Sequence, residues 1–335
     1  MQHATTPVKV STIFAGKLRR YHGVSFLEKL LDIPTILHNT FDMFLVLLGF
    51  FQSFFKLLLW RPQVIFLKGG FVCLPVGYAA RLLRIPIVIH DSDTHPGLTS
   101  RLIAPFADSI ATGAPLKYYN YPEHKTVYTG IPISSEFSHI NNEDKARLKK
   151  ELGLPIEKPV VLVTGGGLGA KRINDAMVAV GSKLAENATI IHLSGTKQFG
   201  ELEQQVPQST NYKLFAFIGS SDIASYLKAS DVVVARSGAS FMAELAAVGA
   251  SAILVPNGQL VGGHQLKNAQ MYADEDAAII VDENKLSNQP QILADQILAL
   301  LDNNTERQRL AKNLYNFAKP DAANTVAKLI EKAAN

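Results

Sequence analysis

Glycine-rich turns are the first residues whose types and spacing suggest chemistry. In the clearest of three, Gly165, Gly167 and Ala170 match the GxGxxG/A spacing between an apolar run and a helical pattern. Backbone amides at such a turn can approach a diphosphate, and the helix that follows favours an anion at its N-terminus. The next apolar run, residues 190–193, ends without the carboxylate that a dinucleotide site needs for a ribose. The motif therefore favours a nucleotide diphosphate over NAD, with a tight packing turn as the alternative.

Two further turns carry polar groups of the same kind. Gly69 and Gly70 follow a strand-like run, and Lys68 beside them suits a second phosphate. The third turn, residues 236–240, opens a helix that contains Glu244. An acid at this place either accepts two ribose hydroxyls or only interacts favourably with the helix dipole. These turns therefore predict an anion site in each half of the chain.

A third cluster begins another helix at His264. Gln265 and Asn268 are three residues apart, so both amides lie on one helix face and are able to read the hydroxyls of one sugar. A solvated helix start is the simpler alternative.

The elements that must position these groups alternate between short apolar runs and helical patterns. Continuous Val, Ile and Leu runs are typical of parallel strands covered by helices on both faces. The pattern restarts after a polar stretch at 134–151, which predicts two doubly wound α/β domains joined near residue 135. Strands are expected at residues 8–14, 64–68, 86–90, 109–112, 126–129, 160–164, 190–193, 213–218, 231–235, 252–256 and 277–281.

Composition excludes several classes of protein. Of the 335 residues, 47% are hydrophobic and 19% are charged, which is unlike a disordered chain. A net charge of +4 is too small for a protein whose main function is to bind a nucleic-acid backbone. The single cysteine, Cys73, excludes an internal disulfide and a cysteine-cluster metal site. With no signal peptide pattern at the start, we expect a cytoplasmic protein without a bound metal.

One apolar segment, residues 41–60, approaches the length that spans a bilayer. Its exceptions, Asp42, Gly49, Ser53 and Lys56, fall on one narrow helical stripe, so the segment is expected to form an amphipathic helix with a wide apolar face. Basic neighbours would suit contact with an anionic membrane surface. Burial between a sheet and a neighbouring helix, and a true membrane span, are the alternatives.

Five motifs in order make the chain similar to one known family. The turns at Gly69 and Gly165 resemble its GGYVSGP and GGSQGA loops, and the run from His90 resembles its HEQN and GLTN pair. The third turn with Glu244 resembles an RSGA…E signature, and the run from His264 resembles HQxxNA. In this order they resemble the MurG family of inverting glycosyltransferases. These enzymes move GlcNAc from UDP-GlcNAc onto undecaprenyl-diphosphate-linked muramyl-pentapeptide in peptidoglycan synthesis.

The resemblance implies a GT-B fold of two Rossmann-like domains. Residues 1–134 would form the acceptor and membrane side, with 320–335 packing back on it, and residues 135–319 would bind UDP-GlcNAc. On the acceptor side, the resemblance implies contacts from Gly69, Gly70 and Asp93. For the donor, it implies contacts from Ser134, Gly166, Gly167, Ile218, Arg236, Ser237, Gly238, Ala239, Ser240, Glu244, His264, Gln265 and Asn268.

Particular roles follow from the same resemblance. Glu244 would hold the uridine ribose, Ile218 would lie by the uracil, and Gln265 with Asn268 would bind GlcNAc hydroxyls. The loop of Gly166 and Gly167 and the turn at 237–240 would meet the diphosphate. The protein would be peripheral on the cytoplasmic face of the plasma membrane, with no cofactor and no nucleic acid as partner.

The chain departs from the family pattern at several positions, most of them expected to lie near the donor phosphates. Ser134 stands in place of an Arg, Gly167 in place of a Ser, Phe241 in place of a Thr and Asp93 in place of an Asn. Family members also begin with a strand, a GGTGGH loop and a helix, which nothing before Val8 resembles. We therefore expect the first domain to be N-terminally incomplete, with its start upstream of Met1 or with a part missing.

The reaction would be one inverting displacement, in which a base takes a proton from the acceptor hydroxyl. Candidate bases are His90, Asp93 and His95, which share one loop after a strand. His90 as a buried core residue and His95 as a solvated loop residue are the simpler alternatives. Two other functions remain open: a catalytically dead or partner-completed nucleotide-sugar-binding fragment, and a UDP-GlcNAc epimerase. The apolar segment favours the transferase over the epimerase.

Overall fold

The computed structural model describes residues 9–17, 32–258 and 263–335. It divides into two compact units. Unit 1 comprises Met1–Tyr128 with Asn324–Asn335, and unit 2 comprises Thr129–Ala323. Each unit contains one parallel sheet, so the α/β expectation is confirmed.

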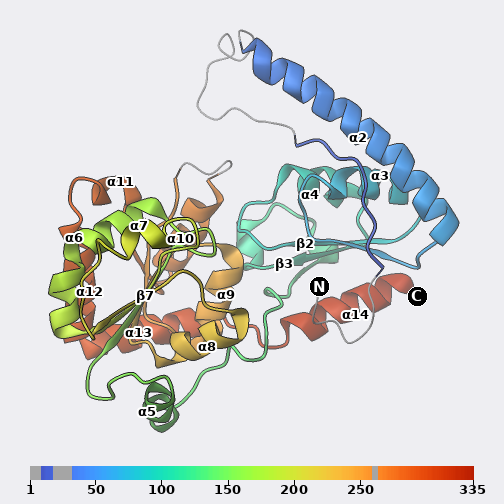
Figure 1. The fold of residues 1–335 in the computed structure, drawn as a ribbon. Coiled ribbons are helices and arrows are strands. Elements are labelled where there is room, and N and C mark those ends of the chain that lie inside the picture. Colours follow the sequence, from blue (N-terminus) through green and yellow to red (C-terminus); the bar gives the residue numbers. More distant parts are fainter. Residues whose placement is uncertain (1–8, 18–31, 259–262) are drawn as a thin grey trace. The chain divides into compact units, whose positions relative to one another are not determined.

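The sheet of unit 1 has the order β1-β2-β3-β4 and is parallel throughout. Figure 1 shows α3 and α4 on one face of this sheet and α14 on the other. Its strands are β1 (Ile65–Leu67), β2 (Ile87–Asp91), β3 (Ser109–Thr112) and β4 (Thr126–Tyr128). Its helices are α2 (Ile33–Trp60), α3 (Cys73–Leu82), α4 (Leu98–Ile103) and α14 (Ala322–Ala334), with short 3-10 turns η1 (Ala104–Phe106), η2 (Leu116–Tyr118) and η3 (Glu123–Lys125).

The strand expected at residues 8–14 is wrong for the part that the structure describes. Residues 9–14 form no strand; Val8 lies outside the described residues. The backbone of this segment bonds to side chains of α2 instead of to a sheet. The amide of Phe14 donates to Oε1 of Gln52 at 2.9 Å, and Nζ of Lys56 donates to the carbonyl of Thr12 at 2.7 Å.

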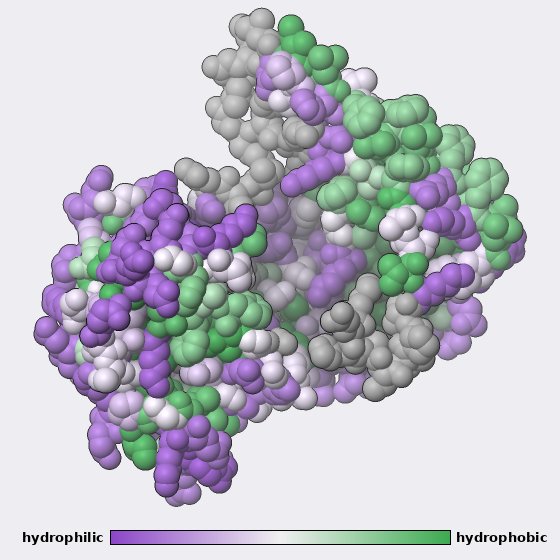
Figure 2. Space-filling view, viewed as in Figure 1, coloured by the Kyte–Doolittle hydropathy of each residue, from purple (hydrophilic) through white to green (hydrophobic). Residues whose placement is uncertain are grey.

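Helix α2 turns its polar stripe inward and its large apolar side chains outward. The buried positions are Gly49, Ser53 and Leu57. A Cβ at Gly49 would lie 1.9 Å from the carbonyl oxygen of Phe14, so only glycine permits this close approach. Of the most apolar 18-residue window, 17% is buried, although the helix is long and apolar enough to cross a membrane. The alternative of a helix buried on both sides is therefore wrong, and Figure 2 shows the hydrophobic surface along α2.

The sheet of unit 2 has the order β10-β9-β8-β5-β6-β7 and is also parallel. Together with unit 1, it confirms the ten strands that the apolar runs predict from residue 64 onward. The strands are β5 (Val160–Thr164), β6 (Thr189–Leu193), β7 (Tyr212–Phe215), β8 (Val232–Ala235), β9 (Ala252–Leu254) and β10 (Ile279–Ile280). The helices are α5 (Asn142–Glu151), α6 (Lys171–Asn187), α7 (Phe199–Leu202), α8 (Ser220–Ala229), α9 (Ala239–Val248), α10 (His264–Asp274), α11 (Glu283–Leu286), α12 (Gln291–Asp302) and α13 (Asn304–Tyr315).

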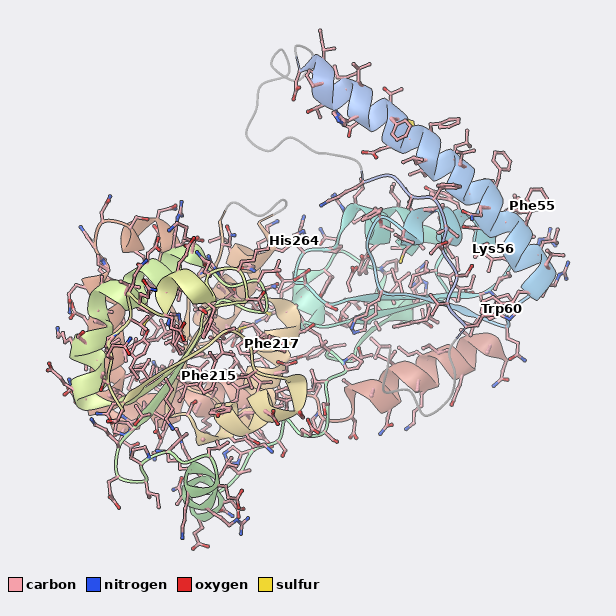
Figure 3. All side chains as sticks on the ribbon, in the orientation of Figure 1. Phe55, Lys56, Trp60, Phe215, Phe217 and His264 are labelled. Carbon is pink, nitrogen blue, oxygen red and sulfur yellow. The ribbon has the colours of Figure 1, made fainter. Side chains whose placement is uncertain are left out.

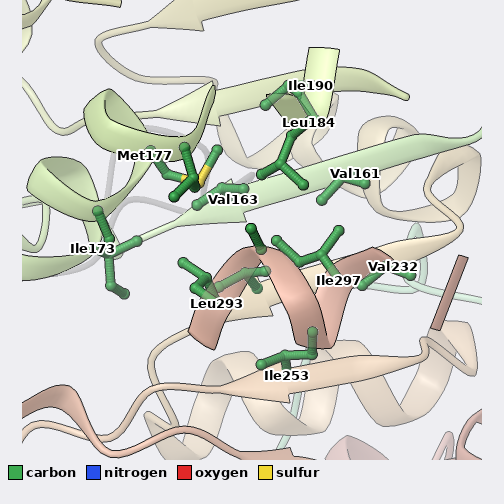
Figure 4. Packing of buried hydrophobic residues seen from close by; sticks show 14 of the residues in the cluster. Val161, Val163, Ile173, Met177, Leu184, Ile190, Val232, Ile253, Leu293 and Ile297 are labelled. Atoms are coloured by element: carbon green, nitrogen blue, oxygen red, sulfur yellow. The ribbon is translucent and has the colours of Figure 1, made fainter. Parts of the chain in front are cut away.

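The core of unit 2 lies between this sheet and helices α6 and α12. Val163 of β5, Met177 of α6 and Ile297 of α12 are each fully buried and belong to one hydrophobic cluster (Figure 4). Such a core provides the rigid edge from which the loops of the site project.

One ionic cluster fastens α5 to the amino ends of β5 and β8. Asp231 accepts from Nζ of Lys145 at 2.7 Å, from Nζ of Lys149 at 2.9 Å and from the amide of Val160 at 2.8 Å. Burial works to raise the pKa of Asp231, but the two lysines and the amide hold it below its usual value. The carboxylate is therefore charged and fully engaged in the folded protein.

Candidate functional site

The first glycine turn joins β5 to α6 and combines two kinds of glycine. A Cβ at Gly165 would lie 2.3 Å from the amide nitrogen of Ala170, and one at Gly169 would lie 2.1 Å from the carbonyl oxygen of Ser194. These two glycines allow tight packing. A Cβ at Gly166 or Gly167 would meet nothing within 4 Å. The turn therefore packs at its ends and leaves its middle open for a ligand.

A buried polar network that the sequence analysis missed lies behind this turn. Nε2 of His192 lies 2.9 Å from Oδ1 of Asn174, and Nδ1 lies 2.8 Å from the hydroxyl of Tyr212. The amide of Asn174 donates to the carbonyl of Ser194 at 2.9 Å. Burial lowers the pKa of His192 to about 4, so the ring is neutral and serves as a fixed link. In the sequence, a polar residue within the apolar run of β6 (His192) and one on the apolar face of α6 (Asn174) were the signals that could have predicted this network.

Arg236 begins the turn between β8 and α9, and its guanidinium is held inside unit 2. Nη1 and Nη2 donate to the two carboxylate oxygens of Glu283 at 2.7 and 2.9 Å. Nη1 also donates to the carbonyl of Val255 at 2.8 Å. Both charged side chains are nearly buried, 11% and 8% exposed. This geometry makes Arg236 an anchor of the turn, with Glu283 as a partner that the sequence analysis missed.

The same turn is tied to the start of α10. Oγ of Ser237 donates to the carbonyl of Gln265 at 2.7 Å, and the amide of Asn268 donates to the carbonyl of Ser237 at 3.1 Å. Oε1 of Gln265 accepts from the amide of Asn257 at 2.8 Å. The structure thus brings the third turn together with Gln265 and Asn268. A Cβ at Gly238 would meet nothing within 4 Å, so the middle of this turn is also open.

Glu244 lies in the second turn of α9 and is half-buried. Within the described part of the chain, its carboxylate makes no hydrogen bond or ion pair. Burial raises its pKa from 4.5 to about 7. Burial disfavours the charged form of such a carboxylate, and a ligand that donates hydrogen bonds to it would stabilise that charged form.

The end of β7 adds an aromatic residue to these groups. Ile218 is buried, whereas its neighbour Phe217 is 60% exposed. Figure 3 shows Phe217 after β7 and His264 at the start of α10. An exposed aromatic ring beside a buried apolar residue suits a planar ligand. Sequence analysis named Ile218 and missed Phe217, although an aromatic residue at the end of a strand was a usable signal.

In unit 1, Gly69 and Gly70 form the turn between β1 and α3. Both have positive φ, 80° and 85°, which favours glycine. A Cβ at Gly70 would meet nothing within 4 Å, and the thiol of Cys73 donates to the carbonyl of Gly69 at 2.8 Å. The turn therefore presents an open backbone at the N-terminus of α3.

The three candidate bases differ in accessibility. His90 lies in β2 with no exposed surface, and its ring makes an edge-to-face contact with that of Phe66 at a centroid distance of 6.5 Å. A general base must reach the proton that it takes. The core role of His90 is therefore the one that the geometry supports, while Asp93 and His95 are partly exposed in the loop that follows β2.

Ser134 lies on the exposed stretch before α5, where its hydroxyl accepts from the amide of Glu136 at 3.3 Å. Across residues 9–17, 32–258 and 263–335, no group of three or more His, Cys, Asp or Glu side chains is arranged to hold a metal.

Two family models match the chain. The model of the glycosyltransferase family 28 N-terminal domain covers residues 6–112, and that of the C-terminal domain covers residues 160–326. A protein of Borrelia hermsii is 31% identical over 97% of this chain and 82% of its own length. One of Clostridium tetani is 31% identical over 97% of this chain and 84% of its own length. Both are named UDP-N-acetylglucosamine--N-acetylmuramyl-(pentapeptide) pyrophosphoryl-undecaprenol N-acetylglucosamine transferase.

Solved structures agree with the fold. A crystal structure of MurG from Acinetobacter baumannii has a TM-score of 0.70 and 26% identity, and covers 87% of this chain and 79% of its own. A UDP-GlcNAc 2-epimerase from Neisseria meningitidis has a TM-score of 0.63 at 11% identity, covers 86% of this chain and 81% of its own, and supports the fold alone. With both family 28 domains and relatives of this identity along its length, the chain belongs to glycosyltransferase family 28 and, within it, to the MurG transferases.

Proposed function

We propose that this chain transfers GlcNAc from UDP-GlcNAc to an undecaprenyl-diphosphate-linked muramyl-pentapeptide. Relatives that match 97% of the chain are named for this activity, which supports the proposal. The observation that carries the donor half is Glu244, a half-buried carboxylate with a raised pKa in the helix that the third turn opens. Because a ribose offers two hydroxyl donors, it compensates for the burial of this carboxylate.

The donor would lie along the carboxyl edge of the sheet in unit 2. The loop of Gly166 and Gly167 and the turn at 237–240 would meet the diphosphate, where the N-termini of α6 and α9 favour negative charge. The amide of Gly166 donates to Oγ1 of Thr164 at 3.1 Å, so the amide of Gly167 would be the donor from the first loop. Ile218 and Phe217 would contact the uracil. The amide nitrogen of Gln265 would bind GlcNAc, whereas Asn268 would act mainly through the carbonyl of Ser237 that it holds.

The proposed chemical step is a single displacement at the anomeric carbon of GlcNAc. The acceptor hydroxyl oxygen forms a bond to the anomeric carbon while the bond from that carbon to the diphosphate oxygen breaks. UDP leaves with the electron pair, and Asp93 or His95 takes the hydroxyl proton. Amides and helix N-termini that face the departing diphosphate would stabilise the charge that develops on it.

We further propose that α2 contacts the cytoplasmic face of the plasma membrane without spanning it. Support comes from its exposed side chains, with Leu59 87% exposed. An apolar helix face of this size, with Arg61 at its end, suits the interface of an anionic bilayer. The outward apolar residues are Ile33, Ile36, Leu37, Phe41, Met43, Phe44, Leu47, Leu48, Phe51, Phe55, Leu58, Leu59 and Trp60.

Sedimentation with phosphatidylglycerol vesicles tests the membrane contact. We expect the double variant Leu59→Gln/Trp60→Gln to bind several-fold more weakly than the parent chain, because less apolar surface enters the interface. Ile156→Gln, which changes an exposed apolar residue of unit 2, is the matched control. Equal binding by the double variant and the control would contradict the proposal.

UDP release tests the transfer itself. The transferase is expected to release UDP only when the lipid-linked acceptor is present, whereas an epimerase would convert the donor alone. Binding of UDP-GlcNAc without UDP release in the presence of acceptor would indicate the inactive alternative. Cys73 supplies a second measurement because it is the chain's one cysteine and lies beside the Gly69 turn. The acceptor should slow its alkylation, and UDP alone should not.

A further inference from the structure

Two stacked tyrosines lie at the carboxyl edge of the sheet in unit 1, and the proposed mechanism uses neither. Tyr119 and Tyr121 follow η2 on the stretch that leads to β4. Their ring centroids are 5.8 Å apart and their planes differ by 12°. Tyr119 is buried. Because each ring supports the other, the two hydroxyl groups are held in defined positions.

The hydroxyl of Tyr119 joins two loops. It donates to the carbonyl of Asp93 at 2.8 Å, and it accepts from the amide of Ala114 at 3.3 Å. Asp93 lies after β2 and Ala114 lies after β3, so one oxygen connects the loops of neighbouring strands. Without that hydroxyl, a carbonyl and a buried amide would each lose a partner.

The hydroxyl of Tyr121 holds the base of the same loop. It donates to Oδ2 of Asp91, the buried last residue of β2. The carbonyl of Asp91 in turn accepts from the amide of Gly113 at 2.7 Å. Burial raises the pKa of both phenols far above the usual value, so each hydroxyl keeps its proton and remains a donor.

We infer that Tyr119 and Tyr121 are positioning residues that hold the loop at 91–97, with Asp93 and His95, against the acceptor. The inference rests on the proposed function. A base works only within hydrogen-bond reach of the proton that it takes, and small displacements of a reacting group cost large factors in rate. The two tyrosines fix this loop at Asp91 and at Asp93, which is two residues before His95.

Tyr119→Phe is the sharpest test, because it removes one oxygen and keeps the ring. We expect kcat to fall about tenfold, with KM for UDP-GlcNAc within about twofold, because the donor binds to unit 2. Tyr121→Phe should act in the same direction. Tyr118→Phe is the matched control, because no hydrogen bond of the Tyr118 hydroxyl occurs among the described residues.

Hydrogen exchange supplies a measurement that needs no activity. In Tyr119→Phe the amide of Ala114 loses its acceptor, and peptides covering 91–97 and 113–118 should exchange about fivefold faster. Unchanged exchange and unchanged kcat in both Phe variants would overturn the inference. A fall in kcat matched by an equal loss in Tyr118→Phe would also overturn it. If the parent chain transfers no GlcNAc, the proposed function fails, and exchange alone decides whether the tyrosines hold the loop.

Discussion

Replacing Glu244 with Gln should separate donor binding from stability, because this carboxylate is half-buried and makes no hydrogen bond or ion pair among the described residues. Burial raises its pKa from 4.5 to about 7. The folded protein therefore binds a proton there that the unfolded chain has released between these two values. The wild type should lose stability as pH rises from about 4.5 to about 7, and should recover nothing above that range.

The magnitude follows from the size of the shift. It corresponds to at most about 3 kcal/mol, and partial exposure of the carboxylate reduces the expected effect to about 1 kcal/mol. Urea unfolding at pH 8 should thus find Glu244→Gln more stable than the wild type by about 1 kcal/mol, and the two chains should be equal near pH 4.5. A variant that is less stable at pH 8 would refute the reasoning.

Donor affinity should show the opposite dependence on Glu244. If only the charged carboxylate accepts the ribose hydroxyls, the Kd for UDP-GlcNAc rises about tenfold between pH 8 and pH 6. Calorimetry with UDP-GlcNAc is preferable to UDP, whose terminal phosphate titrates in this range. Glu244→Gln should bind weakly at both values of pH. A wild-type affinity that does not change with pH would show that the carboxylate does not hold the ribose.

Other changes test the packing described above. Asp231→Ala should destabilise unit 2 by about 3 to 5 kcal/mol in urea unfolding, because it leaves two lysines without their shared carboxylate; Asp295→Ala, at an exposed helical position, is the control and should change little. Since the pKa of Asp231 is lowered, its contribution should disappear as pH falls below the ordinary range of an aspartate, measured by the same unfolding at low pH. Gly169→Ala should lower the melting temperature, because φ is +77° and its Cβ would meet a carbonyl at 2.1 Å. Gly167→Ala should keep the melting temperature and weaken UDP-GlcNAc binding, because its Cβ would enter open space.

The sequence predicted most strands because a parallel sheet covered on both faces leaves continuous runs of branched apolar residues. The segment at 9–14 has a similar composition, but Gln52 and Lys56 of α2 take its backbone groups. Such competition depends on tertiary contacts and leaves no local pattern. Periodicity likewise predicted the polar stripe of α2 correctly, yet it could not say that the stripe faces the protein.

The glycine turns of the site were also predictable, because their spacing is local. The hydrogen-bonded residues that hold the loops of the two units in place were not predictable from the sequence. Asn174 and His192 are 18 residues apart, and Tyr121 and Asp91 are 30 apart, so only the strand order brings them together. Burial was equally hidden: His90 and Asp93 are three residues apart in one motif, but only His90 is enclosed by the sheet.

The pairing of Arg236 with Glu283 has a consequence for how this family can diverge. Losing Glu283 leaves the nearly buried guanidinium of Arg236 without a carboxylate, at a cost of about 3 to 5 kcal/mol. Losing Arg236 leaves Glu283 with Arg172 alone, at 3.7 Å, so the two positions should change together. Relatives that lack the arginine should therefore carry a neutral residue at the position of Glu283. Because Glu283 opens α11 and Arg236 opens the turn between β8 and α9, an alignment of many relatives should reveal this coupling as covariation between residues 47 positions apart.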